Sequence, residues 1–293
     1  MQAKKITSKI FPILIWTLLL LWTVIFGFML IWALTTSLKS GIDFYYNPMG
    51  LPSKQFGGWQ FKNYLVAAQN IKVIDGTKTI GYWQMLGNSL LYAGGSSFLA
   101  VATACIASYC VCKFRHLRWV GWVWSIVLVT NYLPISASLA GNIKFLSDLH
   151  LYDNIFGMWL WGAGAFGGMF LFYYATWKGV SWGYAEAALV DGASHLRVFL
   201  QIMLPMTRTI FGVLFLQSFI GMWNDYMTPM IYLPSMPTIA YGSWQFQFDV
   251  TSSVADITVR LAGLVIILLP VFVLFMIFRN KLMGSLTLGG LKG

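Results

Sequence analysis

The segment EAALVDGASHLRVFLQIMLP, residues 186–205, stands between two apolar runs of this 293-residue chain. It predicts a short helix, a break at Gly192 and a second short helix, with Pro205 at the start of the next apolar run. Glycine permits the positive φ that ends a helix, and proline is tolerated in the first turn. The first short helix carries a small, apolar face made of Ala187, Ala188, Leu189 and Ala193. Because small side chains allow close approach, we expect another protein to contact this segment.

The composition indicates a membrane protein. Hydrophobic residues make up 58% of the chain and charged residues only 10%, whereas soluble domains carry about a quarter charged residues. The mean hydropathy of +0.69 agrees with a lipid environment. The net charge of +10 is placed mainly between apolar stretches, which favours a topological role over nucleic-acid binding.

Six stretches are predicted to span the bilayer, because each is a predominantly apolar run of about 20 residues or more. They cover residues 11–36, 83–112, 120–140, 155–177, 204–232 and 257–278. The first is too long for a signal peptide, so we expect it to be retained. The predicted fold is an all-α membrane protein with an N-terminal helix and outer loop (1–82), a core that holds the other five predicted spans (83–280) and a C-terminal tail (281–293).

The basic residues predict that both termini lie in the cytoplasm. Lysine and arginine are concentrated in segments that this topology places inside, at positions 4, 5, 9, 113, 115, 118, 178, 197, 208, 279, 281 and 292. The short outer loops carry only Lys144 and Arg260 as basic residues. A cytoplasmic excess of basic residues is the usual pattern in membrane proteins.

The long outer segment, residues 38–82, combines aromatic residues with proline and glycine. Its aromatic residues include Phe44, Tyr45, Tyr46, Trp59, Phe61 and Tyr64, and Trp83 follows at the start of the next helix. Two compatible interpretations remain open for it: an aromatic cap at the membrane surface, and a landing surface for an external protein.

The segment at 186–205 resembles the EAA motif of ABC importer permeases, in which EAA, three residues, G, nine residues, I, one residue and LP follow in order. The matching residues are Glu186, Ala187, Ala188, Gly192, Ile202, Leu204 and Pro205. The run Asp191-Gly192-Ala193 and Phe199 resemble the carbohydrate-uptake, maltose-type branch of binding-protein-dependent transport inner membrane components. So do residues 88–90 (NSL), 223–226 (WNDY) and 286–293 (LTLGGLKG). One departure is SWGYA at 181–185, where the family usually has proline and leucine.

The resemblance implies a type I ABC importer permease fold with six transmembrane helices and a cytoplasmic coupling loop. It implies a second permease, two cytoplasmic ATPase subunits and an extracytoplasmic solute-binding protein as partners. ATP hydrolysis belongs to the ATPases, so we expect no enzyme activity and no cofactor in this chain. The residues implied to contact the ATPase are Glu186, Ala187, Ala188, Asp191, Gly192, Ala193 and Pro205, together with Gly289, Gly290 and Lys292 of the tail.

No catalytic or nucleotide-binding motif stands out. The sequence contains no G-x-x-x-x-G-K-[ST] motif, so we expect no P-loop. Residues 162–167 spell G-x-G-x-x-G, but they lie inside a predicted span with no strand before them. Gly164 and Gly168 form a G-x-x-x-G pair, which is typical of a close helix crossing.

The predicted substrate path is built from aromatic and hydrogen-bonding residues, which suit a sugar. Its candidates are Asn131, Tyr132, Trp223, Asn224, Asp225 and Tyr226. Acidic residues at membrane depth usually face a cavity or a partner, so Asp225 either meets substrate or pairs with another helix. Resemblance favours an oligosaccharide, with alginate-type chains as one candidate. The alternatives are a stand-alone secondary transporter or channel and a membrane scaffold.

Overall fold

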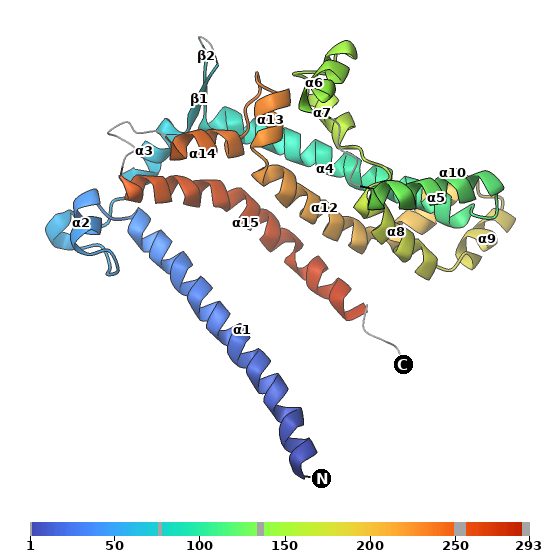
Figure 1. Ribbon diagram of the computed structural model, residues 1–293, viewed down its shortest axis with the longest axis horizontal. Coiled ribbons are helices and arrows are strands. Elements are labelled where there is room, and N and C mark those ends of the chain that lie inside the picture. Colours follow the sequence, from blue (N-terminus) through green and yellow to red (C-terminus); the bar gives the residue numbers. More distant parts are fainter. Residues whose placement is uncertain (1, 76–77, 134–137, 249–255, 289–293) are drawn as a thin grey trace. The chain divides into compact units, whose positions relative to one another are not determined.

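The computed structural model describes residues 2–75, 78–133, 138–248 and 256–288, and helices dominate it (Figure 1). By internal contacts the chain divides into two compact units. The first contains residues 1–72 and 245–268, and the second contains residues 73–244 and 269–293.

The first unit is organised around the end of one long helix. Its elements are α1 (Gln2–Ser37), α2 (Gly41–Tyr46), the 3₁₀ turn η1 (Lys54–Phe56), α3 (Lys62–Asn70) and the first part of α15 (Ile257–Leu288). The segment Phe11–Ser37 is long and apolar enough to cross a membrane, and its most apolar window has no buried residue. Because α1 buries so little against this chain, its apolar side chains are suited to contact lipid or another subunit.

The second unit contains most of the short helices. In order, its elements are β1 (Lys72–Asp75), β2 (Lys78–Gly81), α4 (Tyr82–Lys113), α5 (Arg118–Tyr132), α6 (Leu139–Asp148), α7 (Ile155–Gly162), α8 (Gly168–Gly179), α9 (Gly183–Val190), α10 (His195–Val198), the π-helix η2 (Phe199–Met203), α11 (Leu204–Met206), α12 (Arg208–Asn224), α13 (Met227–Tyr232) and α14 (Ile239–Gln247). The first residue of β1, Lys72, and the last three residues of α14, 245–247, belong to the first unit.

Helix α4 forms the centre of the second unit, where it packs against α7, α8 and α12. Small residues permit the closest of these contacts. A methyl group added at Gly95 would collide with the Trp159 ring, and one added at Gly162 would lie 3.1 Å from Ser96 Cβ. The Trp159 indole Nε1 also donates to the Leu91 carbonyl oxygen at 2.9 Å. The glycines thus allow α7 to lie directly against α4.

Three of the predicted long helices, 11–36, 83–112 and 257–278, are confirmed as long apolar helices. Three helices qualify as spans: Phe11–Ser37, Tyr82–Lys113 and Ile257–Ile277. A fourth candidate is the pair His195–Met206 and Arg208–Asn224, bent by 74°. A total of six spans remains a prediction.

Three of the predicted continuous helices are wrong as single elements. The run 120–140 ends as a helix at Tyr132, and 155–177 is divided between α7 and α8. The break between α7 and α8 covers residues 163–167, where closely spaced glycines disfavour a helix. The run 204–232 is interrupted at Thr207 and again between Asn224 and Met227.

The G-x-x-x-G pair does not form a crossing within the described part of the chain. Gly164 lies in the break between α7 and α8, and Gly168 begins α8. Methyl groups added at these two positions would meet no described atom within 4 Å beyond their own chain neighbours. The close crossing is made instead at Gly95 and Gly162, where a tryptophan and a serine are the opposing groups.

The predicted outer segment, residues 38–82, is an ordered structure rather than a simple connection. It forms α2, η1, α3 and a two-stranded sheet of β1 and β2. The sheet was not expected from an all-helical sequence pattern. Ser40 explains the start of α2, because its Oγ accepts a hydrogen bond from the Asp43 backbone N–H at 3.2 Å.

Candidate coupling segment and substrate path

The segment 186–205 has the predicted shape of two short helices with a bend at Gly192. Helix α9 ends with φ of +83° at Gly192, a conformation that favours glycine. The Gly192 N–H donates to the Leu189 carbonyl at 3.0 Å, and the Ala193 N–H donates to the Ala188 carbonyl at 3.0 Å. These two bonds are the Schellman pattern, which satisfies the last carbonyls of a helix and fixes the direction of exit.

Two serines start the short helices. Ser181 Oγ accepts from the Gly183 N–H at 3.3 Å at the entry to α9, and Ser194 Oγ accepts from the Arg197 N–H at 3.4 Å at the start of α10. The entry to α9 is the place where the sequence departs from the related motif. The Ser181 hydroxyl therefore satisfies one of the free N–H groups at this end of the helix.

The inner face of this segment is anchored on α4 and α8. Ala185, Val198 and Met203 are fully buried in one cluster with aromatic residues of both helices. In that cluster Tyr109 lies 4.7 Å from Phe199 between ring centroids, and the Trp177 Nε1 donates to the Cys105 carbonyl at 3.2 Å. These buried residues form the base of the segment, and their packing attaches it to α4 and α8.

The outer face differs from the small apolar face predicted from the sequence. Ala188, Leu189 and Ala193 are half-buried against the chain's own cluster, because positions 185, 188 and 189 share one side of a helix. The exposed residues between 186 and 197 are Glu186, Ala187, Val190, Asp191, Gly192, Ser194, His195, Leu196 and Arg197. Val190 is 86% exposed and Leu196 is 68% exposed. The surface open to a partner is thus a mixture of apolar side chains with acidic and basic ones.

Basic and aromatic side chains border the segment. Lys113 Nζ donates to the Val180 carbonyl at 2.6 Å and lies 5.8 Å from the centre of the Trp182 ring. Arg115 donates to the Tyr174 hydroxyl at 2.7 Å and lies over Trp124 at 5.2 Å. These contacts fix the connection after α8 without drawing on the exposed face of α9.

One of the predicted contact residues, Pro205, lies apart from that exposed face. Pro205 belongs to α11, beyond the π-helix, and lines an apolar cavity of about 500 Å³ with Phe98 and Phe211. Gly289, Gly290 and Lys292 lie outside the described residues. The compact part of the site therefore consists of α9 and the bend that follows it.

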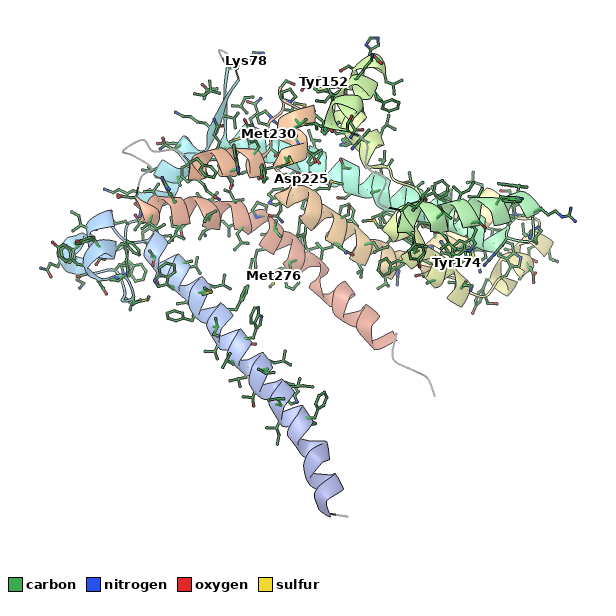
Figure 2. All side chains as sticks on the ribbon, in the orientation of Figure 1. Lys78, Tyr152, Tyr174, Asp225, Met230 and Met276 are labelled. Atoms are coloured by element: carbon green, nitrogen blue, oxygen red, sulfur yellow. The ribbon has the colours of Figure 1, made fainter. Side chains whose placement is uncertain are left out.

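The predicted substrate path is centred on the break between α12 and α13, where Asp225 lies (Figure 2). Asp225 Oδ1 accepts from the Thr228 N–H at 3.0 Å, as a residue does when it caps a helix start. Its Oδ2 accepts from the Tyr92 hydroxyl at 3.4 Å. The carboxylate thus has both a local structural role and a tie to α4.

The neighbours of Asp225 divide between burial and stacking. Trp223 is 2% exposed and stacks on Phe219 at 5.6 Å. Asn224 is exposed and donates to the Ile220 carbonyl at 2.8 Å within its own helix. Tyr226 stacks on Trp244 with ring centroids 5.5 Å apart and planes 6° from parallel. Of these four consecutive residues, Trp223 is therefore closed to a ligand, whereas Asn224 is exposed and Asp225 and Tyr226 are half-buried.

Asn131 and Tyr132 are placed at the end of α5 and are not joined to Asp225 by any contact among the described residues. Asn131 Nδ2 donates to the Val127 carbonyl at 2.8 Å and to the Phe166 carbonyl at 2.7 Å, so it closes the break between α7 and α8. Tyr132 is 82% exposed. Sequence analysis missed Tyr92 and Trp244, which contact the Asp225 region from distant elements and carry no local motif.

The same fold occurs in a solved ABC transporter. The chain aligns with one chain of the "crystal structure of a bacterial ABC transporter involved in the import of the acidic polysaccharide alginate", with a TM-score of 0.76 and 19% identity. The match covers 94% of this chain and 97% of that chain. At this identity the likeness shows the fold alone, that of an ABC importer permease.

Residues 96–283 match the family model of the binding-protein-dependent transport system inner membrane component. The match covers more than half of the chain, so the chain belongs to this family. It is a permease component of an ABC importer, a multi-pass inner-membrane protein and not itself an enzyme. Membership of this family implies partners that include an ATPase and a binding protein.

Curated relatives agree over most of the chain. The diacetylchitobiose uptake system permease protein NgcG of Streptomyces coelicolor is 25% identical over 93% of this chain and 86% of its own length. The probable starch degradation products transport system permease protein AmyC of Thermoanaerobacterium thermosulfurigenes is 24% identical over 88% and 89%. The sn-glycerol-3-phosphate transport system permease protein UgpE of Escherichia coli K12 is 27% identical over 53% and 55%.

Proposed function

We propose that this chain forms, with a second permease, the translocation path for an oligosaccharide that a solute-binding protein delivers. The observation that carries the proposal is the α9 segment, bent at Gly192 and anchored on α4 and α8. Relatives named for diacetylchitobiose and starch degradation products support a sugar. The fold shared with an alginate importer makes alginate-type chains one candidate cargo.

In this proposal α9 is the contact through which two cytoplasmic ATPases move the permease. Glu186, Ala187, Asp191 and Gly192 provide the exposed surface, and the half-buried Ala188 and Ala193 support it, while Pro205 lies further along the chain in α11. The buried base at Val198 and Met203 transfers the movement to α4 and α8. The tail residues Gly289, Gly290 and Lys292 make a further ATPase contact.

The topology that serves this mechanism has six spans with both termini in the cytoplasm. The basic residues at 113, 115, 118 and 178, near the coupling segment, support its cytoplasmic position. The broken runs 155–177 and 204–232 count as spans in this proposal. Breaks at membrane depth are acceptable where the freed backbone lines a cavity or is buried in protein.

The sugar path contains Asn131, Tyr132, Trp223, Asn224, Asp225 and Tyr226. Within this set Asp225 and Tyr226 have the strongest support, because they lie at a helix break and their partners come from other elements. The cargo is identified by measuring uptake of each member of a panel of oligosaccharides by the reconstituted complex.

The coupling role is tested by co-purification of the ATPase together with sugar uptake. Gly192→Pro removes the N–H that bonds Leu189 and forces φ to about −65°, so we expect loss of ATPase binding. Glu186→Lys reverses the exposed charge on α9 and is expected to weaken the same contact. Gly192→Asn is the matched control, because asparagine tolerates the left-handed region. If both disruptive variants hold the ATPase and transport like wild type, the coupling assignment is wrong.

A further inference from the structure

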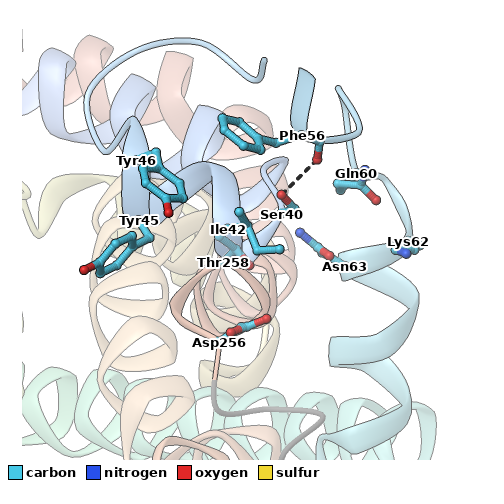
Figure 3. Close-up of a pocket in the computed structure, with 11 residues that line it drawn as sticks. Ser40, Ile42, Tyr45, Tyr46, Phe56, Gln60, Lys62, Asn63, Asp256 and Thr258 are labelled. Atoms are coloured by element: carbon cyan, nitrogen blue, oxygen red, sulfur yellow. Dashed lines mark hydrogen bonds between the residues drawn. The ribbon is translucent and has the colours of Figure 1, made fainter. Parts of the chain in front are cut away.

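A cavity of about 760 Å³ lies in the first unit, between α2, the loop around η1 and the starts of α3 and α15 (Figure 3). Its residues follow the candidate span that ends at Ser37, or stand at the beginning of the span Ile257–Ile277. The cavity is therefore at the end of two predicted spans, where water and lipid headgroups meet. Its volume falls in the range of about 300–1,000 Å³ that is typical of small-molecule sites.

One wall of the cavity is aromatic and unusually open. Tyr46 stacks on Phe56 with centroids 5.6 Å apart and planes 7° from parallel. Tyr45 meets Tyr46 edge to face at 5.3 Å. Tyr45 is 80% exposed and Tyr46 is 69% exposed. Such a wall offers flat apolar faces of the kind that pack against the C–H face of a sugar ring.

The opposite rim is polar and contains both charges. It carries the carboxylate of Asp256, the ammonium of Lys62 and the amide of Gln60 (Figure 3). The Asp256 carboxylate lies directly over Gly41, where an added methyl group would be 2.7 Å from both of its oxygens. The missing side chain at Gly41 thus makes room for an acceptor group at the cavity.

Buried polar bonds hold the aromatic wall in place. Ser40 Oγ donates to the Phe56 carbonyl at 3.0 Å, which ties η1 to the start of α2. The Ser53 N–H donates to Asp43 Oδ2 at 2.8 Å, and Asp43 is fully buried. Fully buried Lys39 donates to the Asn47 carbonyl at 2.6 Å. The cavity is therefore formed before any ligand arrives, which lowers the entropic cost of binding.

We propose that this cavity is an outer binding site for one pyranose ring of an oligosaccharide. The ring stacks on Tyr46, and its hydroxyl groups donate to Asp256 and bond to Gln60 and Lys62. An aromatic belt at a membrane surface needs no carboxylate placed over a glycine and no cavity of this size. The assignment of the ligand rests on the proposed sugar-import function, whereas the binding site itself is tested without transport.

The test measures saccharide binding to the reconstituted complex in nanodiscs without nucleotide. Maltotriose, diacetylchitobiose and an alginate trisaccharide are titrated separately by saturation-transfer NMR. Tyr46→Leu is expected to weaken binding of the preferred sugar by about threefold to tenfold, the range of an aromatic contact. Tyr46→Phe keeps the ring and should retain most of the affinity. Phe61→Leu is the matched control, because Phe61 is 67% exposed on the same segment but does not line the cavity.

A second pair of variants tests the polar rim. Asp256→Asn removes the charge with little change of shape, and Gly41→Ala displaces the carboxylate without altering it. Both should weaken binding by about tenfold, as expected for a hydrogen bond to a charged group. Melting temperatures equal to that of wild type show that the variants are folded.

The proposal is overturned by any of three results. In the first, none of the three sugars binds. In the second, wild type and Tyr46→Leu bind the sugar equally well. In the third, Tyr46→Leu no longer captures the binding protein but keeps its saccharide affinity, which would make the aromatic wall a contact for that protein. Uptake by the complete complex tests import separately. Wild-type uptake with no effect of these variants on binding overturns the outer site alone, whereas binding without uptake overturns the import function alone.

Discussion

The coupling segment and the Asp225 region are both interruptions between helices, but they are built from different information. At 186–205 the bend is made by neighbours in sequence: Gly192 bonds Leu189, and Ala193 bonds Ala188. Around Asp225 only the Thr228 bond is local, while Tyr92 and Trp244 come from distant helices. A local bend is visible in one sequence, whereas a site assembled over long range is visible only in the fold.

The largest expected effect concerns the base of the coupling segment. Trp177→Ala removes a fully buried indole and its bond to the Cys105 carbonyl, so we expect unfolding in detergent to be easier by about 3 kcal/mol. Leu196→Ala is the control on the exposed face and should change stability by about 0.5 kcal/mol or less. Equal melting temperatures for the two variants would contradict the division into a buried base and an open face.

The next effect concerns the bend itself. Gly192→Ala places a side chain at φ of +83°, which costs about 1 to 2 kcal/mol locally. We expect weaker ATPase co-purification and a melting temperature lowered by only a few degrees, because no described atom lies within 4 Å of the added methyl group and backbone strain is the only cost. A variant that binds the ATPase as wild type does would show that the bend is not needed for the contact.

A third prediction separates structure from transport at Asp225. Asp225→Ala removes the bond to the Thr228 N–H and is expected to lower stability by about 1 kcal/mol, as loss of a helix cap does. Asp225→Asn keeps an acceptor for that bond and should be nearly as stable as wild type. Uptake is the deciding measurement, since normal uptake by Asp225→Asn would limit this residue to capping α13 and bonding Tyr92.

The smallest expected effect is at the stacked pair beside Asp225. Tyr226→Leu loses the parallel contact with Trp244, which is expected to cost about 0.5 to 1 kcal/mol. Tyr226→Phe keeps the ring and serves as its control. A larger loss of uptake than of stability in Tyr226→Leu, absent in Tyr226→Phe, would favour direct contact of this ring with sugar.

Much of the coupling segment could be predicted, because helix stops and starts are local properties. Gly192 and the exposed position of Glu186 agree with the sequence pattern. The packing of Ala188 and Leu189 against the chain's own core was not predicted. A short helix of small residues has no clear apolar face until its neighbours are known. The serine start at Ser181 was also missed, although it is a common local signal.

The long helices show the opposite limit. Apolar runs at 155–177 and 204–232 predicted uninterrupted helices, because hydropathy averages over single residues that break them. The glycines between Gly162 and Gly168 and the capping carboxylate of Asp225 produce those breaks. Which glycines meet another helix was not predictable either: Gly95 depends on Trp159, which is 64 positions away.

The lack of burial along helix α1 determines which sequence changes the fold of this chain can tolerate there. Its most apolar window buries nothing against the rest of the chain, and it lies outside the family match at 96–283. The fold of this chain therefore depends on the length and hydropathy of α1 more than on the identity of each of its side chains. Shuffling the order of the apolar residues between Ile13 and Ile31 should leave the fold of residues 73–244 intact, as measured by the melting temperature of the shuffled chain.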